Sequence, residues 1–221
     1  MIDLYTFGTP NGRKVSIALE EMELAYQVTS VDIMKNEQFH ADFLKISPNN
    51  KIPAIVDHQT GISLMESGAI LYYLATKSGR FLPKDPHHHW QALEWLNWQM
   101  GGFGPMLGQA HHFLHFNPGR SDYAEERFGE EAKRLYGVLD RQLAEHEYVA
   151  GDYSIADMAI WPWASLWEGQ EQTLDDKPNL ARWLDLVGSR PAVQRGHALH
   201  LDLRTTKQDK TAQDTLFKPK T

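Results

Sequence analysis

The 221-residue chain is 42% hydrophobic, enough to form one large core or two small ones, and its formal net charge of −7 argues against a nucleic-acid partner. No apolar run approaches the roughly 20 residues of a membrane span, and no signal peptide is visible at the N-terminus, so we expect a cytoplasmic protein without a membrane partner. Because the chain has no cysteine, it has no protein thiol nucleophile, and any thiol chemistry must use a thiol that a substrate brings.

The first part of the chain alternates strand and helix patterns. Apolar residues recur at i, i+3, i+4 and i+7 from Val15, which predicts a helix between two β-branched runs. The order β-α-β-α-β-β-α predicts an α/β domain of thioredoxin type over residues 1–78. The elements expected in this domain are strands over 2–7, 26–33, 52–56 and 62–65 and helices from 15, over 39–46 and from 68.

Residues 79–86 form the expected linker, and no strand pattern follows it. We therefore predict an all-α domain over 87–203 and a flexible tail over 204–221. Glycines and Pro105 are expected to interrupt its first helical run, which starts at residue 87. Further helices are expected over 106–116, from 121 or 122 to about 146, and after 154.

The sequence 154–157, Ser-Ile-Ala-Asp, has the form of a capping box with Asp in place of Glu. Asp157 could be mistaken for a catalytic acid, but the pattern favours a helix cap that helps the second domain fold.

One candidate binding site lies around the predicted hairpin. Pro53 cannot donate a hydrogen bond within a strand, which places it at an edge or a bend. At an edge, the backbone of Ile52 could pair with an extended peptide. Ser67 is a natural helix N-cap beside N–H groups that suit a carboxylate, and Glu66 can accept from an ammonium. These features suit an amino-acid head followed by a peptide backbone, although a plain hairpin and capped helix would explain them too.

A second candidate site is the break after the first strand. The Asn11 amide and the Thr9 hydroxyl can donate to a thiolate, and a helix start lowers a thiol pKa from about 8.5. Ordinary turn and cap chemistry is the alternative interpretation. No metal site is expected: His111 and His115 form an i, i+4 pair without a third ligand.

Longer motifs carry a family resemblance. They are IPAI at 52–55 with ESGAI at 66–70, and, more specifically, TPNG at 9–12, SPNNKIPAIVDH at 47–58, GPMLGQ at 104–109 and YSIAD at 153–157. The chain resembles the nu class of the glutathione transferase superfamily, the bacterial glutathione-dependent disulfide-bond oxidoreductases, from residue 1 to about residue 200. The resemblance implies the cytosolic glutathione transferase fold, a thioredoxin-like N-terminal domain with an all-α C-terminal domain, and a homodimer.

The resemblance also implies site residues. Thr9 and Asn11 would be catalytic and contact the thiol of glutathione, and Arg127 would reach glutathione across the dimer interface. From the residues alone, Gln38 is a solvated loop residue and Arg127 a surface ion-pair partner. The implied glutathione-binding set is Asn11, Gln38, Ile52, Glu66, Ser67 and Arg127. Candidates for an open co-substrate pocket are Met106, His111, His112, Phe113 and Trp163.

The implied activity is glutathione-dependent reduction of a small disulfide or peroxide. Glutathione would be the co-substrate, bound as two thiols or as the disulfide, without a metal. Better-known glutathione transferases place a Tyr, Ser or Cys against the thiol, and Tyr5 is in the wrong place for that role, which argues against efficient conjugation of electrophiles. Two alternatives stay open: a non-catalytic glutathione-binding or regulatory protein, and a transferase that conjugates electrophiles.

Overall fold

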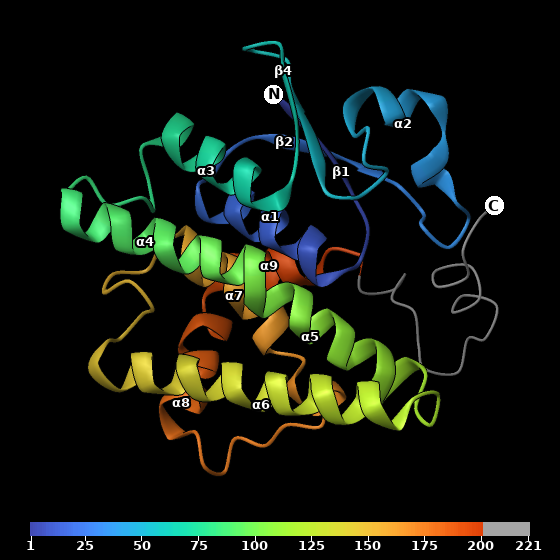
Figure 1. Cartoon of the computed structure of the whole chain (residues 1–221). Helices are drawn as coiled ribbons and strands as arrows, with labels where there is room; N and C mark the ends of the chain where they lie inside the picture. The colour runs from blue at the N-terminus through green and yellow to red at the C-terminus, as the bar shows by residue number, and fades with distance from the viewer. Residues whose placement is uncertain (201–221) are drawn as a thin grey trace.

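A computed structural model describes residues 1–200, which form a small α/β layer above a group of helices (Figure 1). The expected tail over 204–221 lies outside the described residues, as do the last three residues of the expected helical domain. Among helices of the described part, none is both long and apolar enough to cross a membrane.

Within residues 1–200 the chain forms one four-stranded sheet with the strand order β2-β1-β3-β4. Strand β1 pairs in parallel with β2 and antiparallel with β3, and β3 and β4 form the predicted hairpin. Helix α1 (Pro10–Glu21) supplies the crossover that a parallel pair requires. The strands are β1 (Ile2–Thr6), β2 (Tyr26–Ser30), β3 (Ala54–Asp57) and β4 (Ile62–Met65).

The two faces of the sheet have separate cores, because neighbouring residues of a strand point to opposite faces. Ile2 and Leu4 of β1 belong to the large core, which continues into α1 and α3 (Ser67–Ser78) and the C-terminal helices. Tyr5 packs on the opposite face against Phe43 of the short helix α2 (Ala41–Ile46), with the ring centroids 6.2 Å apart. The thioredoxin-like arrangement predicted from the element order is therefore confirmed.

The position of Pro53 differs from one expectation. Strand β3 lies between β1 and β4, so it is an interior strand and not an edge. Pro53 immediately precedes Ala54, the first residue of the strand, and the Ile52–Pro53 peptide bond is cis. The alternative expectation, a bend, is the correct one. The backbone of Ile52 consequently lies outside the ladder.

The C-terminal region is helical, as predicted, but its first run is not broken. Residues 86–116 form one helical run in which π-helical turns over Gln99–Phe103 and His111–Phe116 flank α5. Pro105 is the second residue of α5, which directly follows the first π-helical turn. The helices are α4 (Pro86–Trp98), α5 (Gly104–Ala110), α6 (Asp122–Glu145), α7 (Ile155–Ala164), α8 (Pro178–Gly188) and α9 (Pro191–Ala198).

Two of three expected helix caps are present. Ser121 caps α6 by accepting from the N–H of Ala124 at 3.3 Å, and the capping box of α7 is complete. Ser67, in contrast, is the first residue of α3 and not its N-cap. Glu66 occupies the cap position with φ 70° and makes no side-chain capping bond.

Helix α1 lies between the sheet and the C-terminal helices (Figure 1) and contacts α3, α7 and α9. Arg190 ties this helix to the C-terminal domain, because its guanidinium binds Glu21 through two hydrogen bonds of 2.6 and 2.9 Å. The same guanidinium stacks 3.8 Å from the centroid of the Tyr153 ring. A bidentate, stacked arginine fixes both the distance and the relative orientation of the groups that it joins. Arg190 therefore fixes α1 against the C-terminal domain.

Candidate active site

Two adjoining cavities lie at the start of α1. The larger, about 310 Å³, is mainly apolar and includes Phe116, Trp163 and Leu166 of the C-terminal domain. The smaller, about 260 Å³, includes Glu66 and Ser67 from the start of α3. Asn11, Lys51 and Ile52 line both cavities. A ligand with a polar head and a reactive group could therefore occupy one cavity and reach the other beside Asn11.

Thr9 is the N-cap of α1. Its hydroxyl oxygen accepts from the N–H of Gly12 at 3.2 Å, which leaves the hydroxyl proton free to donate into the larger cavity. Gly12 is required here, because a Cβ atom would lie 2.4 Å from the carbonyl oxygen of Phe7. The positive end of the helix dipole is thus brought to the cavity wall, where it favours an anion.

Asn11 is held from the other domain. The indole N–H of Trp163 on α7 donates to the side-chain oxygen of Asn11 at 2.9 Å. Among the described residues, the Asn11 amide nitrogen has no hydrogen-bond partner. Its two N–H groups are therefore the donors available to a ligand at the junction of the cavities.

The smaller cavity carries an uncommon backbone conformation. Glu66 has φ 70°, a region that non-glycine residues rarely occupy and that is associated with functional sites. Its side chain is exposed, whereas Ser67 is only 5% exposed and starts α3. A carboxylate and the free N–H groups of a helix start thus meet at one end of the cavity.

Lys14 lies beneath this end of the cavity and is missing from the sequence-based candidates. Its ammonium is 3.5 Å from the Ser67 hydroxyl and donates to Gln99 Oε1 at 2.9 Å. Burial lowers the lysine's pKa to about 7, and the nearby charge of Glu66 partly opposes this. Lys14 follows Asn11 by three residues, which puts both side chains on one face of the helix. This spacing is the sequence signal that could have identified Lys14 as a site residue.

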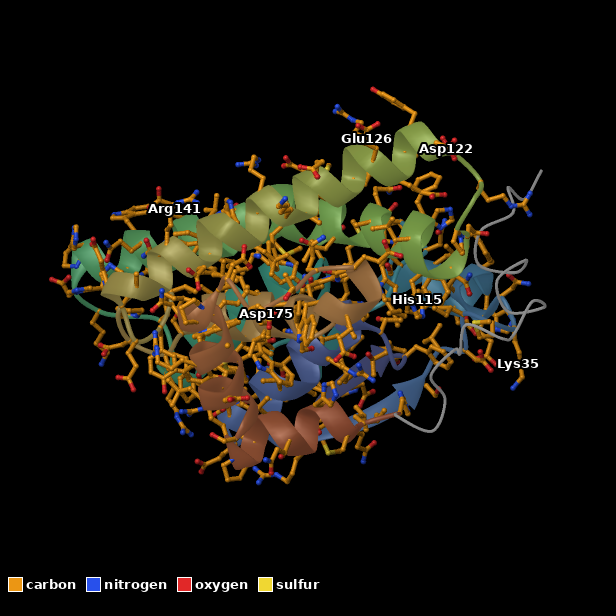
Figure 2. The ribbon with its side chains drawn as sticks, turned by 90° about the horizontal axis from the view of Figure 1, so that it is seen from below. Lys35, His115, Asp122, Glu126, Arg141 and Asp175 are labelled. Carbon is orange, nitrogen blue, oxygen red and sulfur yellow. The ribbon has the colours of Figure 1, made fainter. Side chains whose placement is uncertain are left out.

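Two predicted glutathione contacts lie outside the two cavities. Gln38 is in the 3₁₀ turn Glu37–Phe39, and its Oε1 atom is buried without a hydrogen-bond partner among residues 1–200. Arg127 is on α6, in an open groove of about 800 Å³ that it shares with Tyr123 and Phe128. Asp122, Glu126 and Arg141 project from the outer side of this helix (Figure 2). Of the predicted glutathione-site residues, the two cavities of one chain bring together Thr9, Asn11, Ile52, Glu66 and Ser67.

The histidines contribute to the larger cavity. His111 and His112, in the π-helical turn after α5, line it together with Trp163, whereas Met106 and Phe113 do not. Burial lowers the pKa of His112, which favours its neutral form. The rings of His111 and His115 stack with centroids 4.6 Å apart. Residues 1–200 contain no cluster of three or more His, Asp or Glu arranged as metal ligands.

Comparisons with known proteins identify the family. The "Glutathione S-transferase, N-terminal domain" profile matches residues 2–76. The disulfide-bond oxidoreductase YfcG of Escherichia coli K12 is 50% identical over 205 residues, which are 90% of this chain and 94% of that protein.

Two solved structures are similar over most of the chain. A glutathione transferase from Pseudomonas putida, with one glutathione disulfide bound per subunit, has a TM-score of 0.85 and 44% identity, covering 90% of this chain and 91% of that one. A glutathione transferase family member from Pseudomonas fluorescens, with two glutathione bound, has a TM-score of 0.83 and 42% identity, covering 89% and 92%. Profile, sequence and fold lead to one conclusion: the chain belongs to the glutathione S-transferase superfamily.

Proposed function

We propose that the protein is a nu-class glutathione-dependent disulfide reductase that uses the thiols of bound glutathione. The observation that carries the proposal is the position of Asn11. Its amide donors lie at the junction of two cavities and at the positive end of α1, in a chain without cysteine. These are neutral donors, so they stabilise a thiolate without supplying a competing acid.

Glutathione binds with its amino-acid head in the smaller cavity. The Glu66 carboxylate accepts from the head ammonium, and Ser67 with the first N–H groups of α3 receives the head carboxylate. The free backbone of Ile52 pairs with the peptide part of the ligand. The thiol then lies next to Thr9 and Asn11, where the cavities meet.

Reduction proceeds in two exchange steps. The thiolate of the first glutathione attacks one sulfur of the substrate disulfide, forms a mixed disulfide and releases the other half as a thiolate. The thiolate of a second glutathione attacks the glutathione sulfur of the mixed disulfide, forming glutathione disulfide and releasing the second half. The two protons of the glutathione thiols end on the two product thiols, so atoms and electrons balance.

Asn11 and Thr9 have the same task in both steps. They donate to the sulfur that carries negative charge, which lowers the thiol pKa before attack and stabilises the leaving thiolate afterwards. The apolar walls at Phe116, Trp163 and Leu166 receive the other half of a small disulfide. The same site can reduce a peroxide or conjugate an electrophile, both as weak side reactions.

The names of relatives support this assignment. YfcG is a disulfide-bond oxidoreductase, and the similar Pseudomonas structures hold glutathione disulfide or two glutathione molecules. A site that accommodates both forms of the ligand suits a two-thiol exchange. Glutathione disulfide exchange belongs in a reducing compartment, which fits the cytoplasmic location expected above.

The proposal includes a homodimer. Arg127 lies outside both cavities of its own chain, and we propose that it reaches glutathione from a partner subunit, where its fork suits a carboxylate. Tyr123 on the same helix is 73% exposed, and Tyr72 on α3 is 41% exposed. We expect sedimentation to give a dimer and Arg127→Ala to raise the KM for glutathione about tenfold with a smaller change in kcat. A monomer with full activity would contradict this part of the proposal.

Asn11→Ala is the test of the proposed function. Turnover of hydroxyethyl disulfide with glutathione should fall at least about tenfold, because a hydrogen bond to a charged group contributes about 1.5–3 kcal/mol. Asn179→Ala is the matched control: its amide donates to Asp140 at 3.4 Å, on helices away from both cavities. Unchanged turnover in Asn11→Ala would remove Asn11 from the mechanism.

Calorimetry separates the reductase from its main alternative. A reductase binds reduced and oxidised glutathione and turns over the disulfide. Binding without turnover by the wild-type protein would favour a regulatory glutathione-binding protein on the same scaffold. No binding of either form would exclude both.

A further inference from the structure

We propose that Trp163 is a positioning residue that fixes which end of the Asn11 amide faces the glutathione sulfur. The inference rests on the proposed function, in which the Asn11 N–H groups stabilise a thiolate. It assigns a role in the exchange chemistry to a residue of the C-terminal domain, 152 positions along the chain from Asn11.

The donor and acceptor groups of the two side chains fix the orientation of the amide. An asparagine amide has an acceptor at one end and two donors at the other, and the two ends have nearly the same shape. An indole N–H, in contrast, can only donate. Its contact with Asn11 at 2.9 Å is therefore possible only if the amide oxygen faces Trp163. The NH₂ end is then left for the ligand, and the reverse orientation would place two donors against each other.

Orientation matters because the two ends have opposite effects on sulfur. The NH₂ end donates to a thiolate and stabilises it, whereas the carbonyl oxygen is negative and repels it. An Asn11 that is free to rotate would present the oxygen for part of the time. The pKa of the bound glutathione thiol would then rise, and the leaving thiolate of each exchange step would lose its donor.

Trp163 is held at its indole by one neighbour and at its backbone by another. Gly108 of α5 lies against it, since a Cβ atom at that position would be 3.3 Å from Trp163 Cη2. The Trp163 carbonyl oxygen accepts from Gln170 Nε2 at 3.3 Å, and Gln170 Oε1 accepts from the buried Tyr136 hydroxyl at 2.7 Å. These contacts make Trp163 a rigid donor, as a residue that positions a catalytic group must be.

The test uses Trp163→Phe, which keeps a ring but removes the N–H donor. The pH profile of turnover with glutathione should move, its acid limb shifting to higher pH, and turnover near pH 7 should fall about three- to tenfold. Thiolate absorbance of bound glutathione, measured against pH, should show the same rise in thiol pKa. At a pH above that limb the variant should recover part of the wild-type turnover, and the remaining deficit reflects the leaving thiolate that has lost its donor.

A matched control separates positioning from a structural effect. Trp161, on the same helix, is 8% exposed and donates to the Leu184 carbonyl at 3.0 Å without contacting Asn11. Trp161→Phe should lower stability while leaving the acid limb in place. If Trp163→Phe does not fold, Gly108→Ala replaces it: its Cβ atom would push the indole by a few tenths of an ångström, which should shift the acid limb in the same direction by a smaller amount.

The double variant decides the outcome. In an Asn11→Ala background, Trp163→Phe should have no further effect on the acid limb, because the group that it positions is gone. Additive effects of the two changes, or an unshifted limb in Trp163→Phe, would overturn the inference. Failure of the proposed function gives a different result: Asn11→Ala itself would then keep the wild-type profile.

Discussion

Asp157→Ala is expected to lower the free energy of unfolding by about 3–5 kcal/mol and Tm by about 10 °C. The carboxylate is fully buried and accepts from the N–H of Val149 at 3.1 Å, the N–H of Ser154 at 3.0 Å and the indole of Trp183 at 2.9 Å. Alanine leaves these three N–H donors without an acceptor, at about 1–3 kcal/mol for each. It also removes the acceptor of the Ser154 hydroxyl, which donates to the carboxylate at 3.4 Å. Thermal and urea unfolding measure the loss.

Ser154→Ala is the matched control for this cap. It removes the hydroxyl that accepts from the N–H of Ala156 at 3.2 Å and donates to Asp157 Oδ2 at 3.4 Å, and it leaves the three N–H donors of the carboxylate in place. Its expected loss is therefore about 1 kcal/mol. Equal losses in the two variants would mean that Asp157 acts as an ordinary cap residue and does not organise the buried donors.

The same carboxyl should make stability depend on pH. Burial raises the pKa of Asp157 from 3.8 to about 6, although its hydrogen-bond donors oppose the change. Between these values the folded chain keeps a proton that the unfolded chain has lost. The raised pKa of Asp157 therefore stabilises the folded protein fully below about pH 4. This stabilisation, about 3 kcal/mol in the free energy of unfolding, is lost as pH rises to about 6. The stability of Asp157→Asn should not fall in this pH range. If the free energy of unfolding of the variant falls with pH as that of the wild-type protein does, Asp157 is not the group responsible.

Lys14→Met is expected to be less stable than the wild-type protein near pH 10 and more stable near pH 7. Burial lowers the pKa of Lys14 from 10.5 to about 7, so between these values the folded chain has released a proton that the unfolded chain still binds. The free energy of unfolding of the wild-type protein should thus fall by about 4 kcal/mol relative to that of the variant as pH falls from about 10 to about 7. Near pH 10 the variant should be less stable, since Gln99 loses its 2.9 Å donor.

Urea unfolding at several pH values tests this expectation. Methionine resembles lysine in length and flexibility, so the comparison isolates the ammonium. Lys84→Met, at an exposed position between α3 and α4, is the control and should follow the wild-type curve. A constant difference between Lys14→Met and wild type across the range would show that Lys14 does not titrate in the folded protein.

The sequence by itself determined the features that depend on neighbours along the chain. Strand alternation and helical spacing predicted the α/β layer and the helical region, and the Ser154–Asp157 spacing predicted a capping box that the structure contains. The lack of cysteine determined that any reactive thiol must come from a ligand. These predictions succeeded because hydrogen bonds within helices, turns and caps link residues only a few positions apart.

Other features were decided only by the tertiary structure. Pro53 lies before an interior strand because β1, distant in sequence, pairs with β3. Glycines did not break the helical run, because π-helical turns accommodate them. Lys14 is buried against Gln99, 85 residues away, and Asn11 is oriented by Trp163. No local pattern encodes such pairs: they form where the packing of two domains brings a donor to an acceptor and excludes water from both.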